Sequence, residues 1–306
     1  MNGKDGATKL IRSLLVPPSF VQVDGKDFSD VVESKLPTYG DEWSGVKLTD
    51  AQDTIYNADK AKAEFAKAKE ALQAEGVEFP IHIDVPVDQT DKVLVQRTNS
   101  FKQSVEAALG QENVVIDVQQ MSTDDYDNSA YFAETAAQKD YDLNISGWSA
   151  DYQDPSTYLD ILKSTASDNT KTWFGFDSGS ENAGAKAVGL DEYNKLVDEA
   201  GAETTDIAKR YEKYAAAQAW LTDSAITLPT VSNGGSPMLQ RTVPYSRAAS
   251  WVGTKGTGTF YKYLEMSKDV VTTKDFNKAK EEWLKKKAES NKKAQEDLKD
   301  HIEKKK

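Results

Sequence analysis

The chain has 306 residues, of which 38% are apolar and 29% are charged, and its formal net charge is −12. That length can bury the core of one large or two ordinary domains, and no stretch approaches the roughly 20 apolar residues of a membrane-spanning helix. The acidic balance argues against nucleic acid as a partner, because backbone phosphates require a basic face. The chain contains no cysteine, which excludes disulfides, thiolate metal sites and cysteine nucleophiles.

The first part of the chain, residues 1–56, predicts an irregular segment, because glycine and proline interrupt it repeatedly. One apolar run, Leu10–Val16, ends at Pro17 and Pro18. This run is too short for the apolar core of a signal peptide, and no small-residue cleavage site follows it.

The next part predicts a helix followed by a strand–helix–strand unit. The helix begins at Asn57 and ends at Gly76, and an apolar stripe at helical spacing runs along it. Alternating apolar residues over 79–85 predict a half-buried strand, and a helix over 89–109 and a strand over 114–118 follow. Because the connection between the strands is long and helical, we expect them to be parallel with a right-handed crossover.

A third helix and a third strand complete the pattern. Ser122 and Asp125 have the spacing of a capping box and predict a helix over 123–138. Leu143 and Ile145 then alternate with polar neighbours, which predicts a strand over 142–145. The resulting β–α–β–α–β order is typical of one mixed α/β lobe.

This third strand leads into a polar loop that we interpret as the centre of a ligand site. Gly147 ends the strand, and Trp148 and Asp151 follow at its carboxyl end, where open α/β sheets bind ligands. Asp154 as N-cap and Pro155 as first helical residue then predict a helix over 155–163. The capping role fully explains Asp154, which we assign no ligand contact.

The remaining chain alternates loops and helices. Residues 164–189 predict a loop with an aromatic cluster, which consists of Trp173, Phe174 and Phe176. Helices are expected over 190–201 and 205–221, a short strand over Ala225–Val231, and a glycine hinge over 232–235. The tail is expected to be helical from Thr272 and nearly all charged beyond Lys285. Three side chains are expected to dock this helix: Phe276, Ala279 and Trp283.

Several of these stretches carry a family resemblance. The sequence Gly-Trp-Ser-Ala-Asp-Tyr-Gln-Asp-Pro, with Ser-Thr-Tyr-Leu-Asp after it and Asp223–Pro229 further on, resembles the cluster-5 solute-binding proteins of bacterial ABC importers. The resemblance is to the oligopeptide-binding branch, and in particular to streptococcal surface lipoproteins. It covers essentially the whole chain but only about the second half of a typical member.

The resemblance implies one lobe of a periplasmic-binding-protein-like clamshell: a mixed sheet with flanking helices, plus a return segment and a C-terminal helix. Residues 1–232 would form the ligand-binding lobe, and residues 233–267 would return to the other lobe. Residues 268–306 would form a charged helical tail. The missing N-terminal lobe would then be a partner of this chain.

The resemblance also implies roles for three residues. Asp151 matches the family's aspartate that pairs with the α-ammonium group of a bound peptide, and Trp148 and the Ser149 carbonyl line the same pocket. From the residues alone, Asp151 equally fits a turn before the helix, and Trp148 fits a core position. Ile145 stands where some members carry an arginine for the peptide carboxylate, which predicts tolerance of peptide length.

The implied function is capture of extracellular oligopeptides for an ABC permease, at the outer face of the membrane and without a cofactor. One alternative is a folded interaction or scaffold fragment without peptide affinity. Another is a relative with a non-peptide ligand such as a sugar or metal chelate, although Asp151 favours an amine. Catalysis is not expected, because only His82 and His301 are present and no zinc site or Ser-His-Asp triad is indicated.

Overall fold

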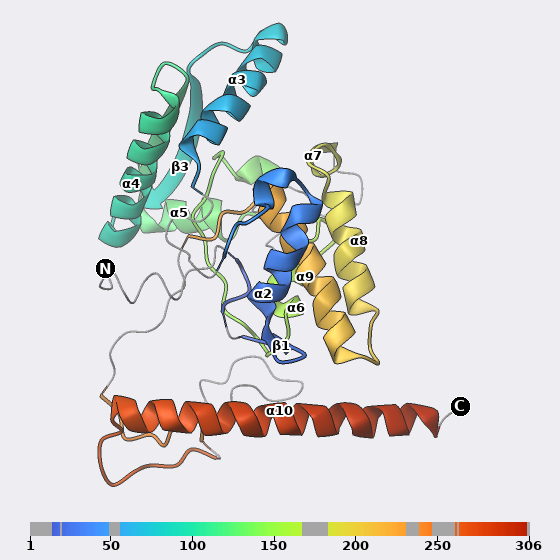
Figure 1. Cartoon of the computed structure of the whole chain (residues 1–306). Helices are drawn as coiled ribbons and strands as arrows, with labels where there is room; N and C mark the ends of the chain where they lie inside the picture. The colour runs from blue at the N-terminus through green and yellow to red at the C-terminus, as the bar shows by residue number, and fades with distance from the viewer. Residues whose placement is uncertain are drawn as a thin grey trace. The chain divides into compact units, whose positions relative to one another are not determined.

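The computed structural model describes residues 14–18, 20–48, 56–166, 183–230, 239–246, 261 and 263–304. The chain divides into two compact units (Figure 1). Unit 1 consists of Met1–Thr54, Ser149–Asp160 and Asp191–Lys306, and unit 2 consists of Ile55–Trp148 and Ile161–Leu190. The predicted aromatic cluster and the predicted glycine hinge lie outside the described residues.

Unit 2 contains the predicted strand–helix–strand unit. Strands β3 (Ile81–Asp88) and β4 (Val114–Met121) are parallel along their whole length, from the pair Ile81 and Val114 to the pair Asp88 and Met121. Helix α4 (Lys92–Leu109) connects them, and α3 (Ala58–Ala74) packs against α4. This part of the prediction is confirmed.

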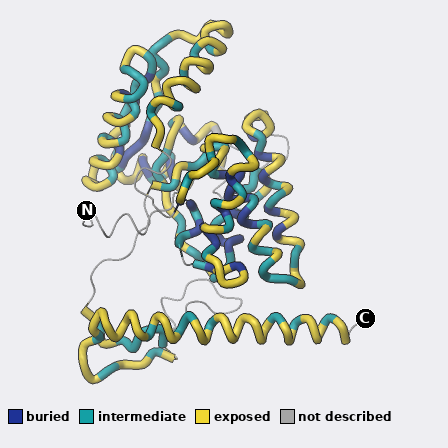
Figure 2. The backbone as a smooth tube through the Cα atoms, in the orientation of Figure 1, coloured by how far each residue is buried: buried dark blue, intermediate teal, exposed yellow. Residues whose placement is uncertain are grey.

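The apolar face of this small sheet forms a core with the helices (Figure 2). Val85 and Ile116 are at most 1% exposed at its centre. Phe65 from α3 and Phe101 from α4 pack against them. The sheet thus buries one face, and the helical apolar stripes visible in the sequence cover it.

Helix α5 (Thr123–Ala130) is shorter than predicted, although Ser122 caps it as expected by accepting from the Asp125 amide at 3.2 Å. The Ala130 carbonyl accepts from the Lys139 ammonium at 2.7 Å. The Glu134 amide, which would continue the helix, donates to the Gln138 side chain at 2.7 Å. The helical ladder therefore stops at Ala130, and only a short 3-10 turn, η3 (Ala136–Gln138), follows.

The predicted strand over 142–145 is wrong, because this segment is irregular. It lies beside β3, where the amides of Asp142 and Leu143 both donate to the Asp84 carbonyl at 3.1 Å. The Asp84 amide donates to the Asp142 carboxylate at 2.9 Å, where a strand would supply a backbone carbonyl. Pairing is thus confined to one residue of β3, and no ladder extends from it.

The middle of β4 is bound to α4 by side chains. The Ile116 amide donates to the Glu106 carboxylate at 3.1 Å, and the Lys102 ammonium donates to the Ile116 carbonyl at 2.5 Å. Lys102 and Glu106 also form an ion pair of 2.6 Å on the same turn of the helix. Both backbone groups of Ile116 are thereby satisfied without a third strand.

Unit 1 is mainly helical. Besides the tail helix, α10 (Thr273–Glu303), its helices include α2 (Phe28–Lys35), α6 (Ser156–Leu159), α8 (Leu190–Gly201) and α9 (Ile207–Ser224). Two short strands, β1 (Gln22–Val23) and β2 (Lys26–Asp27), pair antiparallel. The other short elements of the two units are η1 (Leu36–Thr38), η2 (Asp41–Trp43), η4 (Asp160–Leu162) and α7 (Ala183–Ala187).

The prediction of an irregular N-terminal segment is wrong at α2. Asp27 caps this helix by accepting from the Ser29 amide at 3.0 Å, and Phe28 and Val32 are at most 1% exposed. They are buried because α2 packs against α9, which is distant in sequence. The loop predicted over 164–189 is likewise wrong where α7 forms.

Helices α8 and α9 confirm the two helices predicted after that loop. The strand predicted over Ala225–Val231 is wrong for the part that the structure describes, 225–230. Ala225 has a left-handed φ of 53° that ends α9, and Leu228 is 56% exposed. The apolar residues here therefore do not form a buried strand.

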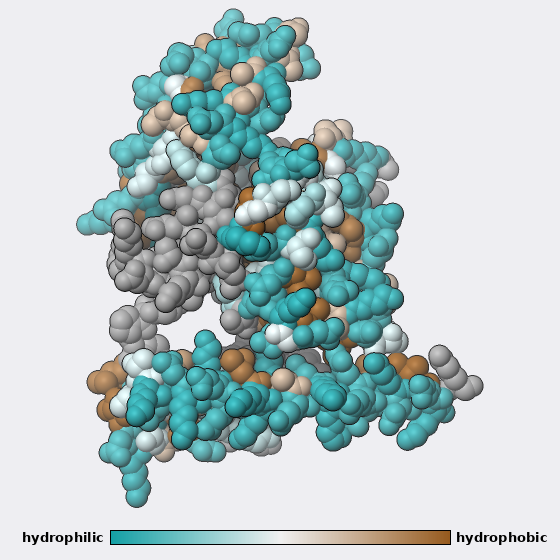
Figure 3. All heavy atoms as spheres, viewed as in Figure 1, coloured by the Kyte–Doolittle hydropathy of each residue, from teal (hydrophilic) through white to brown (hydrophobic). Residues whose placement is uncertain are grey.

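The tail forms α10 (Thr273–Glu303), which begins with a full capping box between Thr272 and Asp275. The Tyr245 ring stacks on Trp283 with centroids 4.8 Å apart and contacts Phe276 at 5.7 Å. Docking through Phe276 and Trp283 is therefore confirmed. No residue of α10 is buried, and its surface is mainly hydrophilic (Figure 3). Among the described residues, no helix combines the length and apolarity needed to cross a membrane.

Candidate functional site

The loop before α6 differs from its predicted cap geometry by one residue. Pro155 is the N-cap and Ser156 begins the helix, although the Asp154 carboxylate still accepts from the Ser156 amide at 3.0 Å. Asp154 thus supports the first turn of α6 without being its cap.

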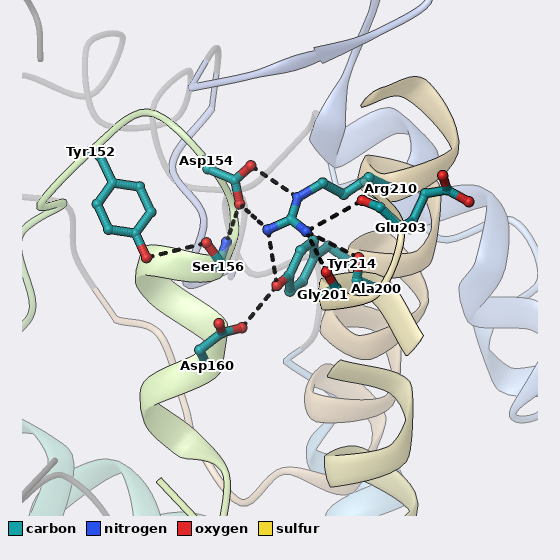
Figure 4. A network of polar contacts seen from close by, with 9 residues as sticks. All are labelled: Tyr152, Asp154, Ser156, Asp160, Ala200, Gly201, Glu203, Arg210 and Tyr214. Atoms are coloured by element: carbon teal, nitrogen blue, oxygen red, sulfur yellow. Dashed lines mark hydrogen bonds and ion pairs between the residues drawn. The ribbon is translucent and has the colours of Figure 1, made fainter. Parts of the chain in front are cut away.

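Support of the first turn of α6 is only part of the role of Asp154, because its carboxylate also forms an ion pair with Arg210 of α9 (Figure 4). Arg210 Nε and Nη2 each donate to one carboxylate oxygen, both at 3.2 Å. The two side chains are only 20% and 22% exposed. The two-point geometry fixes the orientation of both groups. The interpretation of Asp154 from its Asp-Pro context was therefore incomplete.

Arg210 also binds the end of α8. Its Nη1 donates to the carbonyls of Ala200 at 3.2 Å, Gly201 at 3.1 Å and Glu203 at 3.5 Å. Burial alone would lower the pKa of Arg210, but the hydrogen bond and charge of Asp154 outweigh it and raise that pKa. The guanidinium is therefore a permanent cation that joins the α6 loop to the carbonyl end of α8.

Tyr214 extends this network to the end of α6. Its hydroxyl accepts from Arg210 Nη2 at 3.4 Å and donates to the Asp160 carboxylate at 3.0 Å. Burial and the charge of Asp160 raise the pKa of Tyr214, so the hydroxyl stays protonated and remains a donor. Helices α6, α8 and α9 are consequently held together by one polar network.

The backbone around Asp151 is held by further bonds within unit 1. The Asp151 amide donates to the Thr157 hydroxyl at 2.9 Å, and the Gln153 side chain donates to the Phe20 carbonyl at 2.8 Å. The Ser156 hydroxyl donates to the Tyr152 hydroxyl at 3.3 Å. The loop is therefore irregular but connected to its surroundings at several points.

The three residues predicted to bind the ligand differ in exposure and in the unit to which they belong. Asp151 is partly exposed and Ser149 is exposed, and both lie in unit 1. Trp148 is partly exposed and is the last residue of its segment of unit 2. Their joint role in ligand binding stays a prediction.

A separate hollow of about 460 Å³ in unit 2 was not predicted. It is lined by Met121, Asp125, Asn128, Ser129, Phe132, Ala133, Gln138 and Asp140. Phe132 is 66% exposed there, beside acidic and amide groups. These residues come from the end of β4, from α5 and from the segment that follows it up to Asp140. No cluster of metal-ligating residues occurs in the described parts of the chain.

Comparison with known proteins shows what this chain is similar to. Residues 24–170 match the bacterial extracellular solute-binding proteins, family 5, middle region. The chain is 59% identical over 305 residues to the oligopeptide-binding protein AliA of Streptococcus pneumoniae, covering 99% of this chain and 46% of that protein. It is 58% identical to the oligopeptide-binding protein SarA of Streptococcus gordonii, with the same coverage. The chain thus spans about half the length of these relatives.

A solved structure supports the fold. A crystal structure described as a peptide ABC transporter, peptide-binding protein, superimposes with a TM-score of 0.50 and 25% identity, covering 74% of this chain and 79% of that one. The mixed α/β lobe expected from the sequence is therefore confirmed. Residues 24–170 thus match family 5 of the bacterial extracellular solute-binding proteins, and over nearly its whole length the chain resembles about half of the streptococcal oligopeptide-binding proteins, at 55–59% identity.

Proposed function

We propose that this chain supplies the ligand-binding lobe of an oligopeptide-binding protein that delivers peptides to an ABC permease. The observation that carries the proposal is the 59% identity to a protein named for oligopeptide binding. The firmly held loop that bears Asp151 supports it. Residues 1–232 would form the lobe, residues 233–267 would return to a second lobe, and residues 268–306 would form the tail.

In this proposal, an extended peptide is held mainly by hydrogen bonds to its backbone. The Asp151 carboxylate pairs with the α-ammonium group, the Ser149 carbonyl accepts a hydrogen bond, and Trp148 forms an apolar wall. A charge-assisted bond in a closed cleft is stronger than the same bond in water, because the local dielectric is lower. The peptide's amino terminus thus sets its register.

The setting of the proposal follows the family. The protein would act at the extracellular face, anchored to the membrane by a lipid, and would bind rather than transform its ligand. Closure of two lobes about a hinge would present the liganded form to the permease. The relatives are named as binding proteins, which supports a role without catalysis.

Calorimetric titration tests the proposal directly. The chain is titrated with a hexapeptide library that has free amino termini and with the same library after N-acetylation. We expect the free library to bind much more tightly than the N-acetylated library, whose contacts along the peptide backbone remain. Asp151→Asn should weaken binding of the free library by about thirtyfold or more, which corresponds to the ~2 kcal/mol lower bound for losing one partner of a buried charge pair. Asp191→Asn, an exposed change on α8, is the matched control and should bind normally.

The second candidate is a folded interaction or scaffold fragment without peptide affinity of its own. It is favoured by exposed apolar side chains in the proposed return segment, where Leu239 is 87%, Tyr261 is 67% and Met266 is 61% exposed. These residues suit a contact with the part of the relatives that this chain does not match. A folded chain that binds neither library would contradict independent peptide binding and support this candidate.

A further inference from the structure

We infer that Arg210 is a positioning residue for the Asp151 loop, and that its contact with Asp154 sets how strongly the site distinguishes a peptide ammonium from a neutral terminus. This inference rests on the proposed function. Arg210 lies in α9, remote in sequence from the loop, and its role follows from the contacts that join the two (Figure 4).

The first step is the path from Arg210 to the loop. The guanidinium holds both oxygens of Asp154, and one of those oxygens also accepts from the Ser156 amide at 3.0 Å. Thr157, the next residue, accepts from the Asp151 amide at 2.9 Å. The backbone from Asp151 to Thr157 is thereby closed into a hydrogen-bonded turn, and the ion pair connects that turn to α9.

The second step is that the connection depends on shape as well as charge. Three carbonyls at the end of α8 and the Tyr214 hydroxyl occupy the other donors of Arg210, so the guanidinium has one orientation. A lysine ammonium cannot meet both oxygens of Asp154 and these carbonyls at the same time. Arg210 therefore fixes the position of the loop relative to α8 and α9.

The third step links position to specificity. A carboxylate that recognises a cation must be held close to it, as in enzyme sites, where a displacement of about 1 Å can lower the reaction rate as much as a hundredfold. Contacts along the peptide backbone are spread over many atoms and depend less on one loop residue. Loss of Arg210 should therefore reduce discrimination of the amino terminus more than overall peptide affinity.

The experiment measures the ratio of affinities for the free and N-acetylated hexapeptide libraries in Arg210→Gln, Arg210→Lys and Asp154→Asn. We expect this ratio to fall by about tenfold in Arg210→Gln and Asp154→Asn, with partial recovery in Arg210→Lys. Lys213→Gln is the matched control. It removes a cation from the same helix that also donates to the α8 end, at Glu199. Equal weakening of both libraries, with the ratio unchanged, would show that Arg210 is merely structural.

A measurement without ligand separates this inference from the proposed function. Hydrogen exchange at the amides of Asp151 and Ser156 should accelerate by about tenfold or more in Arg210→Gln and remain unchanged in Lys213→Gln. If the wild-type chain binds neither library, the proposed function fails, but the exchange result still decides the positioning role. Unchanged exchange at both amides would overturn it.

Discussion

Substitutions of Arg210 and Asp154 should have strongly non-additive effects on the free energy of unfolding, because the two side chains form an ion pair. We consider Arg210→Met, Asp154→Asn and the double variant. Because both side chains are about four-fifths buried, screening by solvent reduces their interaction only modestly. Arg210→Met leaves the Asp154 carboxylate without its cation and removes the donors to three carbonyls, so we expect a loss of about 3–5 kcal/mol.

Asp154→Asn should cost less, about 1–3 kcal/mol, because the amide oxygen still accepts from Ser156 and Arg210 keeps its carbonyl partners. In the double variant no charge is left buried. Its loss should therefore fall short of the sum of the single losses by about 1–3 kcal/mol.

Native-state hydrogen exchange of α9 in increasing urea is the appropriate assay. The chain has two compact units, so unfolding of the whole molecule need not be two-state. Exchange of the α9 amides reports the free energy of opening unit 1 alone. Additivity of the two substitutions to within about 0.5 kcal/mol would refute the coupling.

Three further predictions concern other parts of the chain. Gln218 is 1% exposed and accepts from the Val16 amide at 3.3 Å, so Gln218→Met should destabilise unit 1 by about 1–3 kcal/mol in urea titration; a loss below about 0.5 kcal/mol would contradict this contact. Hydrogen bonds from the hydroxyl and amide of the threonine two residues later lower the pKa of Glu203 from 4.5 to about 2. Glu203 therefore stabilises the fold above pH 4.5, and this contribution is lost as the pH falls towards 2. The thermal midpoint of Glu203→Gln should fall less over this range, and parallel curves would argue against the prediction. Tyr245→Ala removes the ring that stacks on Trp283 and should speed hydrogen exchange in the first turns of α10 by about two- to tenfold; unchanged exchange there would show that the stack does not dock the helix.

The elements that were predicted correctly carry their signals locally. Asn57 caps α3 by accepting from the Lys60 amide at 2.9 Å, and Gly76 follows with a φ of 84°. The alternation in β3 and the helix between β3 and β4 likewise depend on neighbouring residues. Thr272 and Asp275 form the capping box that starts α10. Such caps and patterns favour the same local structure whatever distant residues pack against it.

The errors arise where distant residues decide the structure. Helix α2 has only eight residues and depends on burial against α9. The segment after Lys139 fails as a strand because the Asp142 side chain bonds the Asp84 amide. Arg210 lies 56 residues from Asp154, so their pairing left no local pattern. For the candidate site, the sequence suggested the residues of the loop but not the network that holds it.

The side chains that cover β4 also affect how the chain behaves at high concentration. An exposed strand offers its amides and carbonyls to a strand of another molecule, which is a common route to aggregation. At Ile116 both groups are already bound, by Glu106 and Lys102. Hydrogen bonds, first from Lys102, lower the pKa of Glu106 to about 2, so the carboxylate keeps its charge in acid. A strand of another molecule would have to displace these two side chains to pair at Ile116, and the low pKa of Glu106 keeps this protection in place across the mildly acidic range.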